Sequence, residues 1–86
     1  MLFAQRLVQK EYPNAWIKCT EEGKELGAGA SGFKLWEIVA SKEIGAPVLN
    51  KAYGETLAWK LAAQDLALKV SDQHERMKLI SQIFSE

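Results

Sequence analysis

An apolar residue recurs every three or four positions from Leu49 to Phe84, and this spacing constrains the chain more than any other sequence feature. Nine of the eleven positions are apolar; the series is Leu49, Ala52, Thr56, Trp59, Ala63, Leu66, Val70, Gln73, Met77, Ile80 and Phe84. Such a period is typical of helices that bury one side. It predicts helical structure from Pro47 toward the end of the chain.

Two interpretations of this stretch stay open. A single helix over 47–85 would be roughly 60 Å long, too long for a compact domain of 86 residues. Alternatively, two helices form an antiparallel hairpin that breaks at Ser71–Asp72, where Asp72 and Glu75 have capping-box spacing. We favour the break, although the unbroken apolar phase keeps the single helix open.

The N-terminal half changes period twice. Residues 1–12 have the apolar spacing of an amphipathic helix, and Pro13 disfavours its continuation. Alternation then begins at Ala15, and Gly23 offers a turn, so we predict a β-hairpin over 15–28. A flexible glycine loop follows over 27–32, and the region 33–86 is predicted to be helical, beginning with a helix from Phe33 to Glu43.

The length allows one domain over residues 1–86. We predict an α+β fold that is mainly α, a small helical domain with one short β-hairpin; an all-α bundle is the alternative. The expected core is apolar throughout and consists of Phe3, Leu7, Trp36, Val39, Trp59, Leu66, Val70, Ile80 and Phe84.

The charge balance excludes several classes of protein. Eleven basic and eleven acidic residues give no net charge, so the chain lacks the field of a general nucleic-acid or anionic-membrane binder.

No run of 18 apolar residues is present, and the N-terminus lacks a signal-peptide pattern. The single Cys19 excludes an intramolecular disulfide. We therefore expect a cytoplasmic protein with no membrane partner.

Few residues point to catalysis. Gly27-x-Gly29-x-x-Gly32 has the letters of a dinucleotide-binding fingerprint but lacks the strand and second half that this fold needs. We interpret it as a loop; anion binding by its N–H groups, which would make the chain a nucleotide binder or small enzyme, is the alternative. His74, Cys19 and Ser31 have no catalytic companions in sequence. We expect no enzyme activity, cofactor or metal site.

The excess of apolar helix surface predicts a protein–protein interaction module, a homodimer or other homo-oligomer that self-associates through its C-terminal helices, or a module that binds another protein. The candidate interface residues are Trp59, Leu61, Leu68, Leu79 and Ile83. Three tryptophans each lie on an apolar face of a predicted element, and one that proved exposed would be the leading interface anchor.

The alternative function is a small DNA-binding regulator. Residues 39–54 loosely resemble a helix-turn-helix segment, with Lys42, Asn50 and Lys51 as the nucleic-acid contacts. Residues 33–51 contain three lysines and two glutamates, a net charge of only +1. Specific DNA binders neutralise several phosphates, so nucleic acid is the less favoured partner.

Overall fold

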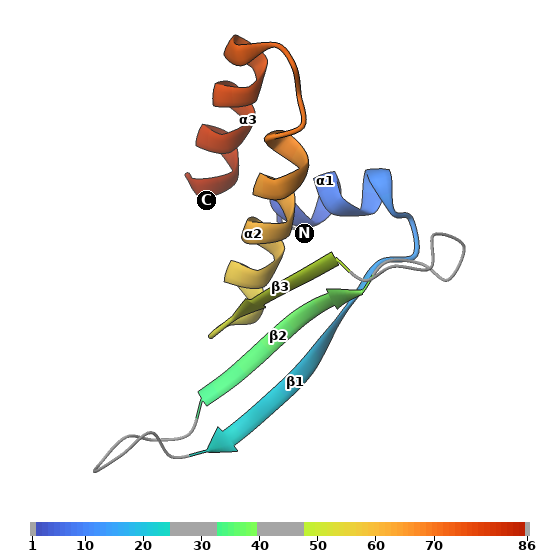
Figure 1. Cartoon of the computed structure of the whole chain (residues 1–86), viewed down its shortest axis with the longest axis vertical. Helices are drawn as coiled ribbons and strands as arrows, with labels where there is room; N and C mark the ends of the chain where they lie inside the picture. Colours follow the sequence, from blue (N-terminus) through green and yellow to red (C-terminus); the bar gives the residue numbers. More distant parts are fainter. Residues whose placement is uncertain (1, 25–32, 40–47, 86) are drawn as a thin grey trace.

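The fold was obtained as a computed structural model that describes residues 2–24, 33–39 and 48–85. In chain order these residues form α1 (Phe3–Glu11), β1 (Trp16–Lys24), β2 (Phe33–Val39), β3 (Val48–Ala52), α2 (Glu55–Ala67) and α3 (Gln73–Phe84). The strands make an antiparallel sheet in the order β1-β2-β3. The helices gather on one side of it, with α2 against β2 and β3, α1 against α2, and α3 outermost (Figure 1). The fold is therefore α+β and mainly α, as predicted, and the all-α alternative is wrong.

Helix α1 confirms the predicted N-terminal helix. Ala4 and Val8 face the core, and the backbone N–H of Tyr12 donates to the Val8 carbonyl just before Pro13. The Gln9 side chain then donates from Nε2 to the Ala15 carbonyl at 3.3 Å. This bond ties the helix to the chain entering β1.

The predicted hairpin exists, but its turn and second strand were placed wrongly. Strand β1 runs through Gly23 to Lys24, and its partner is β2 rather than Glu25–Ala28, which lies outside the described residues. Gly23 falls in a register shift between Glu22 and Lys24. Glycine in a strand often marks such a bulge, so the residue that indicated a turn marks an irregularity instead. The loop predicted over 27–32 lies outside the described residues.

The helix predicted from Phe33 to Glu43 is wrong over its described part, because 33–39 form the central strand. Its apolar run fits a buried strand as well as a helix, and periodicity alone does not separate the two. The helix predicted from Pro47 is likewise wrong over 48–52, which form β3. Helix α2 begins only at Glu55, after Gly54 in an extended conformation.

The two-helix interpretation of the C-terminal half is confirmed. Helix α2 ends at Ala67 and α3 begins at Gln73, with Asp72 as its N-cap. The break that capping-box spacing predicted at Ser71–Asp72 is therefore present, and a single helix over 47–85 is wrong.

Small side chains dominate the buried core. Among the described residues, seven of the eleven buried apolar side chains are alanines: Ala4, Ala15, Ala52, Ala58, Ala62, Ala63 and Ala67. The other four are Val8, Ile38, Trp59 and Ile83. Four of the alanines line α2, where α1 and the sheet pack. Without bulky side chains at these positions, the elements approach one another closely.

The predicted core is partly right. Trp59 is buried, and Phe3, Leu7, Trp36, Leu66 and Ile80 are partly buried against the core cluster. Val39 and Val70 are half-buried. Phe84 is wrong, because 43% of it is exposed and the neighbouring Ile83 is fully buried instead. Helix α3 is thus rotated about its axis relative to the predicted apolar series.

Ile38 tests the central strand, because its side chain is fully buried. We expect Ile38→Val to lower the free energy of unfolding by about 0.5–1.5 kcal/mol, the usual cost of removing one buried methylene. Urea unfolding followed by circular dichroism measures the change. Leu49→Ala is the control: Leu49 is 58% exposed on β3, and its substitution should cost less than about 0.5 kcal/mol. Equal costs at the two positions would contradict the assigned strand faces.

Candidate interaction surfaces

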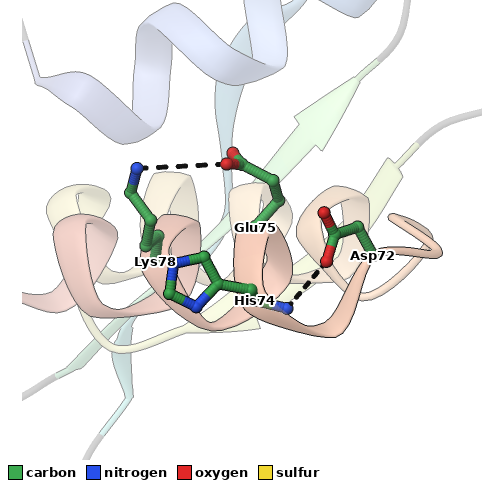
Figure 2. Close-up of polar contacts among 4 residues, drawn as sticks. All are labelled: Asp72, His74, Glu75 and Lys78. Carbon is green, nitrogen blue, oxygen red and sulfur yellow. Dashed lines mark hydrogen bonds and ion pairs between the residues drawn. The ribbon is translucent and has the colours of Figure 1, made fainter.

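Local hydrogen bonds fix where α3 begins. The Asp72 carboxylate accepts a hydrogen bond from the His74 backbone N–H at 3.0 Å (Figure 2). The Glu75 carboxylate, which the capping box would aim back at Asp72, instead forms an ion pair with Lys78 Nζ at 3.9 Å. Both side chains of this pair are more than half exposed, so the pair contributes little to stability. The Asp72 cap is therefore the main local determinant of the helix start.

A second polar contact joins α3 to the end of α2. Arg76 Nη1 donates to the Val70 carbonyl at 3.0 Å, across the turn between the two helices. This carbonyl follows α2, where helix-type bonds are no longer available to it. Arg76 thereby satisfies an acceptor in the turn and holds the first turn of α3 against the α2–α3 connection.

The rest of α3 packs through one narrow side. Ile83 is its only fully buried residue within the described chain, and Leu79 and Ile80 are partly buried against the core. Met77 and Phe84, by contrast, are 62% and 43% exposed. Gln73, Met77, Ile80 and Phe84 follow one another at steps of four, three and four residues, which places them along one line of the helix. We call this line the α3 seam.

A shallow hollow runs along the outer side of α3 next to Met77. Its lining is mostly small or polar and consists of His74, Met77, Lys78, Ser81, Gln82 and Ser85. In Figure 1 this helix lies at the outside of the helical layer, with α2 on its inner side. The surface that α3 presents outward is thus uneven, with a protruding thioether beside two serines.

The structure separates the predicted interface residues. Trp59 and Ile83 are 3% and 0% exposed, so they belong to the core and are not accessible to a partner. Leu61 and Leu79 are partly buried against that core, and Leu68, at the end of α2, is 54% exposed. Met77 and Phe84 were missed because the apolar series placed them inside. The signal that could have identified them is the inward line of the helix, which consists of Arg76, Leu79 and Ile83. The charge of Arg76 makes this line look less apolar in the sequence than the seam.

A second exposed apolar area lies on the sheet face opposite the helices. Trp16, 44% exposed, has Val39 as its cross-strand Cα partner. Leu49, 58% exposed, is three positions from buried Ala52 on β3 and therefore points to the opposite face. Trp16 therefore meets the condition of exposure that the sequence analysis set for an interface anchor. Trp36 and Trp59 point toward the core instead.

The helix-turn-helix arrangement predicted over 39–54 is wrong. Residues 48–52 form a strand, and Lys42 lies outside the described residues. Asn50 and Lys51 are neighbours on β3 and so point to opposite faces of the sheet. Lys51 is exposed, whereas the Asn50 amide nitrogen is buried without a hydrogen-bond partner. The two side chains therefore do not form one groove-facing surface.

The described residues offer little for small-molecule chemistry. Among them, no group of three or more His, Cys, Asp or Glu side chains is arranged to hold a metal ion. A cleft between the helices, lined by Leu7, Lys10, Glu11, Leu66, Ala67, Val70 and Leu79, has a volume of about 230 Å³. Small-molecule sites usually have roughly 300–1,000 Å³ and enclose most of the ligand. The hollow beside Met77 has a volume of about 520 Å³, but it is shallow and open to solvent. The glycine loop and Ser31, considered for anion binding, lie outside the described residues.

None of the helices in the described part of the chain has the length and apolar character needed to cross a membrane.

Comparisons with known proteins give no assignment. No protein-family model, curated protein or solved structure matches the chain.

The Asp72 cap provides a test of how α3 is held. We expect Asp72→Ala to lower the free energy of unfolding by about 1 kcal/mol, because the His74 N–H loses its acceptor. Urea unfolding measures the loss, and amide exchange locates it in the first turn of α3. Ser71→Ala, at the exposed neighbouring position, should change stability by less than about 0.5 kcal/mol. Unchanged exchange at the start of α3 in Asp72→Ala would contradict the cap.

The three tryptophans differ in burial, and fluorescence quenching separates them. Trp16 is 44% exposed and Trp59 only 3%. Trp16→Phe should therefore remove most of the emission that acrylamide quenches, while Trp59→Phe should leave the quenchable part largely intact. Circular dichroism confirms that both variants are folded. A larger loss of quenching in folded Trp59→Phe would contradict the placement of these two side chains.

Proposed function

We propose that this chain is a small non-catalytic protein–protein interaction module that self-associates through its C-terminal helices. The single cysteine fits a reducing compartment, and we place the protein in the cytoplasm. The surface that mediates association is the α3 seam, with Leu68 at the end of α2 as a further exposed apolar residue.

The observation that carries this proposal is the exposure of Met77 and Phe84. A helix that packed only against its own domain would direct its large apolar residues inward. Helix α3 instead has two apolar lines, of which one, Leu79 and Ile83, is used by the core. The other packs Ile80 partly against the core and leaves Met77 and Phe84 exposed. A partner helix would cover this second line.

The small size of the chain is consistent with a partner. Small domains bury a limited fraction of their surface, and association is one way in which they gain more. The DNA-binding alternative has no such support, because its reading helix would fall on strand β3.

Sedimentation equilibrium over about 10 µM to 1 mM tests self-association. We expect a reversible increase in average mass with concentration in the unaltered chain. Met77→Glu should weaken the association constant at least about tenfold, because pairing would then bury an uncompensated carboxylate. Both measurements require circular dichroism to show that the variant remains folded.

Leu49→Glu is the matched control, since it adds the same charge at an equally exposed apolar residue on β3. It should leave the association constant unchanged. A strictly monomeric unaltered chain at every concentration would refute self-association. Dissociation by Leu49→Glu but not by Met77→Glu would transfer the interface to the exposed sheet face.

A further inference from the structure

We propose that His74 and Met77 form a binding site for a soft monovalent metal ion, of which copper(I) is the biological example and silver(I) the redox-inert probe. The sequence alone does not indicate a metal site, because His74 is the single histidine and no Cys/His cluster is present. The structure adds the hollow on the outer side of α3, whose lining contains both side chains. This inference goes beyond the proposed self-association and does not rest on it.

Helical spacing brings the two donor atoms together. Residues three apart on a helix are neighbours, with Cβ atoms about 5–6 Å apart. A metal ion with bonds of about 2.1 Å to nitrogen and about 2.3 Å to sulfur joins two donors that lie up to about 4.4 Å apart. The methionine side chain has three rotatable bonds, so Sδ of Met77 can take such a position beside the His74 imidazole. One ion is thus within reach of both residues.

Both side chains are accessible to an ion. Met77 is 62% exposed, and His74 is exposed as well. The hydrogen bond of His74 to Asp72 uses the backbone N–H and leaves the imidazole nitrogens for other partners. Binding on this outer side of α3 therefore does not require the core to open.

The local charge does not oppose a cation. Lys78 also lines the hollow, but its Nζ forms an ion pair with Glu75 at 3.9 Å. Figure 2 shows this amine directed toward Glu75 and away from the His74 ring. The other cation of the same helical turns, Arg76, donates to the Val70 carbonyl at the α2–α3 connection. The imidazole and the thioether therefore lie beside a compensated pair of charges.

The donor types select the class of metal. Thioether sulfur favours soft ions such as copper(I), and imidazole nitrogen is a general ligand for transition metals. Structural zinc sites take four protein ligands. Among the described residues, no group of three or more His, Cys, Asp or Glu side chains is arranged to hold a metal ion. One imidazole and one thioether therefore fit a soft ion of low coordination number better than zinc.

Titration with silver(I), followed by nuclear magnetic resonance, tests the site. A Cys19→Ser background removes the thiol, which also binds soft ions, and the titration is run at a concentration at which sedimentation finds the monomer. We expect the Met77 methyl and His74 ring signals to shift together and to saturate at a single ion per chain. His74→Ala and Met77→Leu should each lower the silver affinity at least about tenfold, because the second donor of a pair binds as an intramolecular ligand. Circular dichroism checks that each variant is folded.

Exchanging residues 74 and 75 gives a matched control. His74→Glu combined with Glu75→His keeps the composition but moves the imidazole about 100° around the helix. The imidazole is then two positions from Met77, and residues at that spacing do not face each other. This variant should lose silver affinity as His74→Ala does. Retained affinity would show that the two donors bind separately and would overturn the proposal.

Two further outcomes would also overturn it. Zinc(II) should bind at least about tenfold more weakly than silver(I), and equal binding would contradict the assignment to soft ions. Methyl shifts confined to Met1, the other methionine, would place silver away from His74.

The metal site and the proposed function fail separately. Silver binding at His74 and Met77 of a chain that sedimentation finds strictly monomeric would support the site and refute self-association. A chain that associates at high concentration, but whose monomer binds no silver at this pair, would keep the proposed function and overturn this inference.

Discussion

The close approach of α2 to α1 and to the sheet is the contact on which the rest of the structure depends. Ala58, Ala62, Ala63 and Ala67 are all buried along α2. A methyl side chain keeps backbones near one another, as in other interfaces built from small residues. Its burial also stabilises the fold far less than burial of a large aliphatic side chain, which contributes about 1.5–3 kcal/mol. The core therefore gains close packing but little stabilisation per residue.

The small volume of this core explains why some large apolar side chains remain exposed. Only Ile38, Ile83, Val8 and Trp59 are fully enclosed beyond the alanines of the described residues. Helix α2 packs against α1 and the sheet. Helix α3 packs against α2 through Ile83, with Leu79 and Ile80 partly buried beside it. A helix held mainly by one enclosed side chain has no second core to receive Met77 and Phe84. Their exposure follows from the small volume of the α2 layer.

Local signals in the sequence predicted two helix boundaries, the end of α1 and the start of α3. Pro13 ends α1, and Asp72 begins α3 through a bond within two residues of itself. The segment from 33 to 52 was misassigned because its structure depends on distant pairing. Trp36 lies opposite Cys19 on one side and Ala52 on the other, and no window of local sequence contains both contacts. Ala52 fits the helical apolar series, yet it reaches the core from a strand.

The candidate surface was only partly predictable, for a different reason. The helical spacing of the seam residues was evident in the sequence, but its orientation was not. The side of α3 that faces inward is set by the docking of Ile83, which is a tertiary contact. The same side contains the charged Arg76, so the sequence does not mark it as buried. Leu68 was identified as exposed, whereas Trp59 was assigned to the interface because the helix around it is apolar on most sides.

The proposed association would be coupled to local order at α3. Any partner that binds only the ordered helix stabilises it by mass action, and the gain grows with partner concentration. Helix α3 has one fully buried residue and an exposed N-cap bond, so it is expected to open at lower free energy than α2. A second copy on the seam would add apolar contacts to the element that has fewest. The same exposed residues would then serve recognition and complete the packing of the helix that carries them.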